Sequence, residues 1–160
     1  MRSRSFRAQF VVILAVVVAA LAVTAATASH AEVERVNVEE LGRLPAFSHA
    51  TVAAAPLVFV AGTLGTTPGS SDLIAGGVGP QTRQTLENID RILAAAGSSR
   101  DDVLKCTVYL SDMTSFAEMN ENWIPFFGGK PPARATIGVQ ALALGAAVEI
   151  ECIAQRSGTS

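Results

Sequence analysis

Histidine and lysine are both scarce in this sequence. Only two of the 160 residues are histidine, and His49 is the only one beyond the first 31 residues. A single imidazole argues against a Ser-His-Asp triad and against a histidine-rich zinc site, so we expect neither a metal nor a cofactor. The two lysines, Lys105 and Lys130, and the arginines are scattered, whereas nucleic-acid-binding surfaces cluster such residues to neutralise phosphates. We therefore expect no nucleic-acid partner.

The N-terminal region has no acidic residue before Glu32. Three arginines lie among the first seven residues, an uninterrupted apolar run spans residues 10–23, and small residues follow up to residue 31. This order is typical of a secretory signal peptide, here with cleavage expected after residue 28 or residue 31. The apolar run is shorter than the roughly 20 residues that a membrane-spanning helix needs. The sequence therefore predicts export to the periplasm or the exterior, with an uncleaved N-terminal membrane anchor as the alternative.

Residues 32–160 contain no internal repeat or low-complexity tract, so we expect one domain after a signal peptide of residues 1–31. Cleavage would remove three of the 12 basic residues and none of the 14 acidic ones, which leaves a net charge of −5. Two cysteines, Cys106 and Cys152, lie in expected strands. We favour buried thiols over a disulfide for them, because the sequence does not show that their Cα atoms come within about 7 Å.

The apolar pattern alternates between the period of a strand and that of a helix. Apolar residues recur at helical spacing between Pro80, which suits a first helical turn, and Gly97, which suits a helix end. A second helix is expected to begin at Asp112 or Thr114, and the glycine-rich segment 65–79 to form a loop. The expected strands are residues 49–53, Leu57–Leu64, Val103–Leu110, 133–141 and 147–155, with the first two joined as a hairpin.

The last expected strand has two chemically different faces. Val148, Ile150 and Cys152 alternate with Glu149 and Glu151, so one sheet face is apolar and the other carries two carboxylates. Two helices and about six strands predict an α+β fold with both helices on one face of a single mixed sheet. The opposite face, with its glutamates, then either faces water or needs a cover.

Six segments of this domain are similar to the RidA/YjgF (reactive intermediate deaminase) family in order and spacing. They are VFVAGTLG, QTRQTLENIDRILAAAG, DVLKCTVYLSDM, FAEMNENWIPFF, PPARATIGV and AAVEIECIA, within residues 47–154. The resemblance implies a chorismate-mutase-like fold, a mixed six-stranded sheet with two helices on one face, and a homotrimer with three clefts between subunits. It also implies that the face carrying Glu149 borders such a cleft, since a small domain gains buried area by assembly.

The resemblance implies that Arg134, in PPARATIGV, binds the substrate carboxylate. A planar guanidinium offers paired donors to a carboxylate and so fixes both its position and its orientation. Glu149 would position or activate the water that attacks the C=N carbon, and it could pass a proton when an enamine tautomerises to an imine. The alternative for Arg134 is a salt bridge with a glutamate across a subunit interface.

Five further positions match the pocket of the family. Gly62 and Thr63 end an expected strand near the substrate, and Thr136 leaves the same strand face as the carboxylate-binding arginine two residues earlier. Trp123 replaces a family aromatic residue and is either core or pocket wall. Phe47 stands where the family archetype has a tyrosine, and it cannot donate a hydrogen bond. Its presence predicts weaker activity on archetypal imino acids, or a preference for a more apolar substrate side chain.

The resemblance implies hydrolytic deamination of 2-imino or 2-enamino carboxylates to 2-oxo acids and ammonia, so a small-molecule carboxylate is the expected substrate. The imino acids that archetypal relatives destroy arise in the cytoplasm, which an exported protein would leave. Export therefore keeps an alternative open: a non-enzymatic extracytoplasmic trimer that binds a small carboxylate as a sensor, scavenger or chaperone-like protein. A ribonuclease activity, claimed for some relatives, fits poorly with export and an acidic domain.

Overall fold

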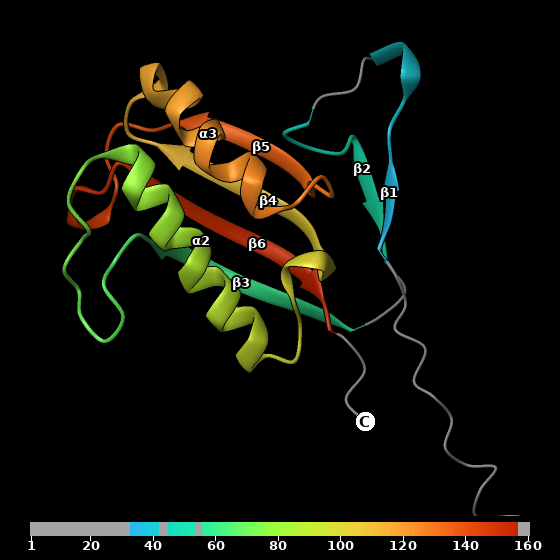
Figure 1. Cartoon of the computed structure of the whole chain (residues 1–160), viewed down its shortest axis with the longest axis horizontal. Helices are drawn as coiled ribbons and strands as arrows, with labels where there is room; N and C mark the ends of the chain where they lie inside the picture. The colour runs from blue at the N-terminus through green and yellow to red at the C-terminus, as the bar shows by residue number, and fades with distance from the viewer. Residues whose placement is uncertain (1–32, 42–44, 54–55, 157–160) are drawn as a thin grey trace, which may run out of the picture. The chain divides into compact units, whose positions relative to one another are not determined.

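The computed structural model of the chain describes residues 33–41, 45–53 and 56–156 (Figure 1). The predicted signal peptide, residues 1–31, lies outside these ranges. Within them, no helix has the length and apolar character that crossing a membrane would require. All described residues fall in a single unit of the chain, residues 30–159.

The main sheet has four strands in the order β3-β6-β4-β5 (Figure 1). They are β3 (Leu57–Leu64), β4 (Val103–Leu110), β5 (Ala133–Gly138) and β6 (Val148–Gln155). β6 pairs antiparallel with both β3 and β4, whereas β4 and β5 are parallel. Parallel neighbours need a crossover connection. The helix between β4 and β5 supplies it, so the mixed character of the predicted sheet is confirmed.

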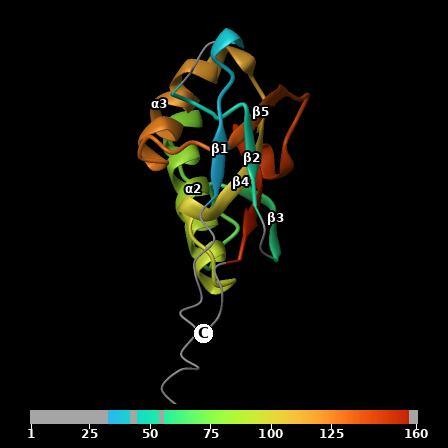
Figure 2. The same cartoon turned by 90° about the vertical axis from the view of Figure 1, so that its right-hand side faces the viewer.

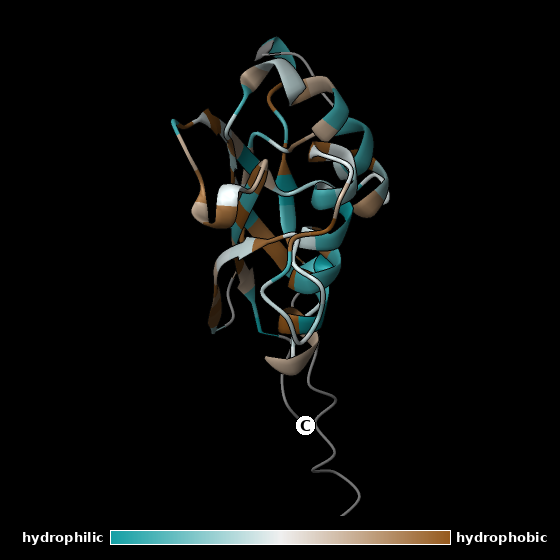
Figure 3. Ribbon diagram, turned by 90° about the vertical axis from the view of Figure 1, so that its left-hand side faces the viewer, coloured by the Kyte–Doolittle hydropathy of each residue, from teal (hydrophilic) through white to brown (hydrophobic). Residues whose placement is uncertain are grey.

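Two helices, α2 (Val78–Ala95) and α3 (Phe116–Phe126), cover one face of this sheet (Figures 1 and 3). Hydropathy colouring shows polar and apolar stretches along both helices, as expected of amphipathic elements (Figure 3). Gly97 has φ 71°, a conformation that few side chains tolerate, so the predicted end of α2 is confirmed. Before α3, the Asp112 carboxylate accepts a hydrogen bond from the backbone N–H of Thr114, in front of the short 3₁₀ turn η3 (Met113–Ser115).

The core lies between these helices and the sheet. Its largest fully buried side chains include Trp123, Leu86, Ile89, Leu93, Met119 and Ile150. The predicted alternation along β6 is confirmed, because Val148, Ile150 and Cys152 are buried on the helix side and the two glutamates point to the opposite face. We refer to that helix-free side of the four-stranded sheet as the open face.

The prediction of one six-stranded sheet is wrong in its pairing. β1 (Glu34–Val36) and β2 (Ala50–Val52) form a separate antiparallel pair, seen side by side in Figure 2, so β2 does not form the predicted hairpin with β3. The remaining described helical segments are short 3₁₀ turns: η1 (Glu39–Leu41), η2 (Arg100–Asp102) and η4 (Ala143–Gly145).

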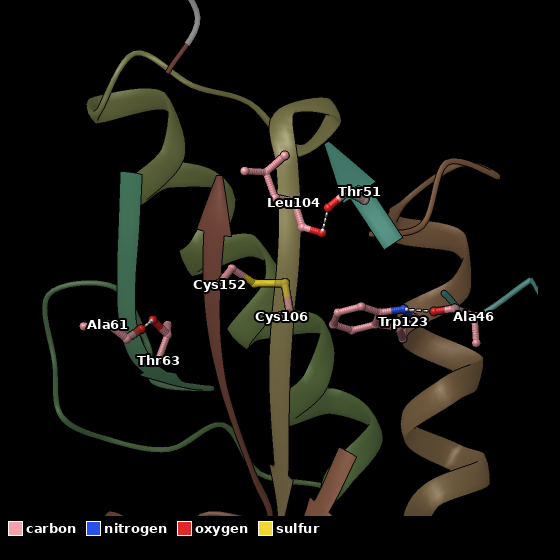
Figure 4. Close-up of a disulfide and its surroundings, with 8 residues drawn as sticks. All are labelled: Ala46, Thr51, Ala61, Thr63, Leu104, Cys106, Trp123 and Cys152. Atoms are coloured by element: carbon pink, nitrogen blue, oxygen red, sulfur yellow. Dashed lines mark hydrogen bonds between the residues drawn. A yellow bond between two sulfur atoms is a disulfide. The ribbon is translucent and has the colours of Figure 1, made fainter. Parts of the chain in front are cut away.

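Hydrogen bonds to the β4–β5 edge of the sheet explain why β2 does not form a hairpin with β3. The backbone N–H of Ser48 donates to the Pro132 carbonyl at 2.9 Å, and the Thr51 hydroxyl donates to the Leu104 carbonyl at 2.7 Å (Figure 4). Ser48 also forms an isolated parallel bridge with Ala133. These bonds hold the segment before β3 against β4 and β5, at the far edge of the sheet from β3.

The preference for free thiols is also wrong, because Cys106 and Cys152 form a disulfide (Figure 4). The two residues are direct partners in the β4–β6 register, with their Cα atoms 4.1 Å apart. The sequence placed both in strands but could not give the register that sets them opposite each other. A disulfide in this position is typical of a protein that matures in an oxidising compartment.

Replacing both cysteines with alanine is expected to lower the free energy of unfolding by roughly 2–4 kcal/mol, because the bond restricts the unfolded chain. Urea unfolding of the oxidised wild type and of the Cys106→Ala/Cys152→Ala variant measures the difference. Wild type treated with dithiothreitol is the matched control, since it retains both side chains. A double variant as stable as the oxidised protein would show that the disulfide contributes nothing.

Candidate active site

Arg134 lies on β5 with its side chain on the helix side of the sheet, in register with Cys106. Its guanidinium Nη1 donates to Oδ1 of Asn120, on α3, at 2.7 Å. The guanidinium carbon lies 5.0 Å from the ring centre of Trp123 and 5.6 Å from that of Phe116. Such stacking orients a guanidinium while leaving its remaining donors available.

The charge of Arg134 has no anionic partner within the described part of the chain. Its side chain contacts the Asn120 amide, the Met119 sulfur and two aromatic rings. Burial lowers the pKa of Arg134 to about 10, so the group is still protonated at neutral pH. A half-buried cation without a counter-ion gains more from a bound carboxylate than a solvated one does, because less water must be displaced.

Trp123 belongs to the core and offers no surface to a ligand. Its side chain is completely buried, and Nε1 donates to the Ala46 carbonyl at 2.9 Å (Figure 4). Of the two possibilities left open by the sequence, the core residue is correct and the pocket wall is not. Trp123 can influence a substrate only as the ring against which the Arg134 guanidinium lies.

Thr136 shares the strand face of Arg134, as predicted from the spacing of two residues. Its Oγ1 is shielded from solvent and has no hydrogen-bond partner in the described ranges. An unpaired buried hydroxyl is uncommon, because it costs free energy comparable to that of a lost hydrogen bond. Thr136 therefore places an unpaired hydroxyl on the same strand face as Arg134.

Glu149 lies on the opposite face of the sheet from Arg134. It is the register partner of Leu64 on β3 and of Tyr109 on β4, and its side chain is half-buried on the open face. The carboxylate lies directly over Gly62. Thr63, in contrast, is in register with the inward-facing Ile150, and its hydroxyl donates to the Ala61 carbonyl at 2.9 Å (Figure 4). Gly62 and Glu149 are thus brought together, whereas Thr63 turns to the other side of the strand.

Tyr109 adds a phenol to the open face next to these carboxylates. Its Oη donates to Oε1 of Glu151 at 3.1 Å. This hydrogen bond, with partial desolvation and the negative charges of Glu151 and Glu149, raises the pKa of Tyr109. The open face therefore presents two carboxylates and a protonated phenol.

Phe47 lines a cavity to which neither Arg134 nor Glu149 contributes a wall. The cavity has a volume of about 420 Å³, and its other walls are Arg35, Asn37, Pro45, Ser48, Gly129 and Pro131. The Phe47 ring packs edge-on against His49 at 5.9 Å, and His49 Nδ1 accepts a hydrogen bond from the backbone N–H of Val38. Nδ1 of His49 is thereby bonded to the segment that follows β1.

Asn120 is the hydrogen-bonding amide partner of Arg134 that sequence reasoning missed. It lies one helical turn after Phe116 and just before Trp123, on the α3 surface that faces the guanidinium. Its position four residues beyond Phe116 is the only sequence signal that could have indicated it. Asn88, in contrast, links α2 to the end of β3 and to the loop that follows β3, by donating to the carbonyls of Leu64 and Thr66.

No group of three or more histidine, cysteine or acidic side chains in the described ranges is arranged to hold a metal ion. The chemistry available is that of a guanidinium on one side of the sheet and carboxylates on the other. Because the sheet separates them, Arg134 and Glu149 of one chain cannot contact the same small ligand.

Comparisons with known proteins match this chain to one family. The model of the Endoribonuclease L-PSP family matches residues 37–156. The RutC family protein PH0854 of Pyrococcus horikoshii is 44% identical over 105 residues, covering 66% of this chain and 83% of the relative. The mouse 2-iminobutanoate/2-iminopropanoate deaminase is 43% identical over 97 residues, covering 61% and 72%. The crystal structure of YyfB of Yersinia pestis, from the Rid family, aligns with TM-score 0.72 and 30% identity over 78% of this chain and 98% of its own.

Proposed function

This chain belongs to the Endoribonuclease L-PSP family, which includes the RidA/YjgF proteins, and from that premise we propose that it hydrolyses 2-imino or 2-enamino carboxylates. Water adds to the C=N carbon, and the C–N bond then breaks to give a 2-oxo acid and ammonia. The observation that carries the proposal is the half-buried Arg134 guanidinium, which is oriented by Asn120 and aromatic rings but lacks an anionic partner in the described ranges.

Arg134 is the proposed anchor of the substrate carboxylate. Asn120 takes up one donor, and the planar fork retains others that match the two oxygens of a carboxylate. The unpaired Thr136 hydroxyl on the same strand face can bond a further substrate atom. Since imines already hydrolyse in water, fixing the substrate beside one water molecule is enough for a useful acceleration.

Glu149 is the proposed residue that orients this water. Because it lies on the open face, it must come from a different subunit than the arginine that holds the substrate. We therefore propose a homotrimer with a cleft at each interface. The open face favours such assembly, since it exposes Phe59 (74%), Leu57 (50%) and Ile137 (45%) to solvent in the single chain.

Deamination is tested by measuring ammonia and 2-oxo acid release from imines formed in situ by an amino-acid oxidase. The mature protein is expected to accelerate release for at least one member of a substrate panel, with apolar side chains preferred because Phe47 cannot donate a hydrogen bond. Sedimentation at working concentration tests the trimer. A protein that is monomeric, or that leaves the spontaneous rate unchanged for every substrate, would contradict the proposal.

Export to the periplasm or the exterior is part of the same proposal. Its support is the basic and apolar order of residues 1–31 together with the Cys106–Cys152 disulfide, which an oxidising compartment favours. N-terminal sequencing of the secreted protein is expected to begin at residue 29 or 32. Protein that retains Met1 would point instead to a membrane anchor.

Export and Phe47 also favour a second candidate, a trimer that binds a small carboxylate without converting it. Both candidates use Arg134. They differ in turnover: a carboxylate that raises the melting temperature of a protein unable to deaminate any imine would support binding alone.

A further inference from the structure

We propose that Gly62 is a positioning residue: because it has no side chain, it leaves open the space on the open face in which the Glu149 carboxylate lies. The inference rests on the proposed deaminase function. It differs from the expectation from the sequence, which was that Gly62 lies near the substrate. In this arrangement, the side-chain position of Gly62 acts through Glu149.

A β-bulge in β3 brings Gly62 into this position. Val60 is in register with Cys152, and Thr63 is in register with Ile150, so β3 advances three residues where β6 advances two. The additional residue re-aims the side chains that follow it. As a result, Thr63 points to the helix side and Gly62 lies exposed on the open face, diagonally opposite Glu149.

The Glu149 side chain occupies the space that a side chain at position 62 would need. A Cβ atom built on Gly62 would overlap Oε1 of Glu149 and come within 3.1 Å of its carboxyl carbon. Real Cβ atoms essentially never come this close to other atoms, so any residue other than glycine must displace the carboxylate. Gly62 does not need to be glycine for its own backbone conformation, because it is not among the residues with positive φ.

This contact matters for catalysis because a carboxylate that orients water must be held in one place. Glu149 has a flexible side chain, and its carboxylate lies in the space over Gly62 that a Cβ atom would fill. A displacement of about 1 Å in a positioned group can reduce a rate by roughly 100-fold. In the proposed trimer, the Arg134 that serves this site belongs to a neighbouring subunit, so Gly62→Ala adds its methyl group on the Glu149 side and changes no residue of the carboxylate anchor.

The test is a double-mutant cycle of Gly62→Ala and Glu149→Asp. Gly62→Ala alone is expected to lower kcat roughly 10- to 100-fold with little change in KM, since substrate binding depends on Arg134. Aspartate is one methylene shorter and leaves room for the added methyl group. The double variant is therefore expected to be no slower than Glu149→Asp alone, which is a non-additive result.

Gly138→Ala is the matched control, because Gly138 also lies on a strand of the same sheet and its added methyl group also meets a flexible side chain, that of Met113 at 2.7 Å. It should leave kcat unchanged. Crystal structures of the variants report the Glu149 position independently of turnover. An unmoved carboxylate in Gly62→Ala, a kcat equal to that of wild type, or additive losses in the cycle would each overturn the inference. An inactive wild type would instead overturn the proposed function.

Discussion

Arg134→Ala is expected to lower kcat/KM for imine hydrolysis by at least about 100-fold, because it removes a charge-assisted, paired hydrogen bond to the substrate carboxylate. Arg134→Lys should recover only part of the loss, since an ammonium keeps the charge but lacks the planar fork. The coupled oxidase assay, with each imine generated in situ, measures both variants. The melting temperature should not fall greatly, because the buried charge of Arg134 has no carboxylate partner in the described ranges.

Arg100→Ala is the matched control for this prediction. Arg100 also lies over an aromatic ring, that of Phe126 at 4.4 Å, but it is paired with Asp90 on the outer surface of the helices. Its loss should leave turnover unchanged. If Arg134→Ala and wild type hydrolysed imines at the same rate, the carboxylate anchor would have to be elsewhere and the deaminase proposal would lose its main support.

The second expected result is recovery of activity from two inactive variants. Arg134→Ala and Glu149→Ala each destroy one half of every site in a homotrimer. After denaturation and joint refolding, random mixing gives about one quarter of the interfaces an intact arginine on one subunit and an intact glutamate on its neighbour. Activity should rise from near zero to about that fraction of wild type, as measured in the same assay.

The control is the double variant Arg134→Ala/Glu149→Ala, which carries both defects in one chain. After the same denaturation and refolding, it should show no activity by itself or when mixed with either single variant. Native mass spectrometry confirms that mixed trimers form. Mixed trimers without activity would indicate that both residues of each site come from one chain, contrary to their placement on opposite faces of the sheet.

Local sequence patterns predicted much of this fold. The apolar residues before Gly97 recur at helical spacing, and those along β6 alternate with polar residues. Both patterns lie within one segment of the chain, so the sequence alone indicates the helix and the strand. Strand Leu57–Leu64 and strand Val103–Leu110 have the bounds expected from their apolar residues. The same-face placement of Arg134 and Thr136 followed from a spacing of two.

Properties that depend on distant partners were not predictable. The β2–β3 hairpin was expected because the two strands are close in sequence, but β2 pairs with β1 and is held by Ser48 and Thr51 against the other edge of the sheet. The disulfide required the β4–β6 register, and the separation of Arg134 from Glu149 required the strand order. Each depends on tertiary pairing, which residue spacing within one strand does not encode.

The Cys106–Cys152 bond also fixes the alignment of the strands that carry the carboxylates. Sliding β6 along β4 by a single residue would turn Glu149 and Glu151 into the core and Ile150 out of it. A covalent link between the two central strands forbids that slip and keeps Tyr109 opposite Glu149. The disulfide thus fixes the strand register of the open face. Cys152 lies three residues from Glu149, whose placement the proposed reaction requires.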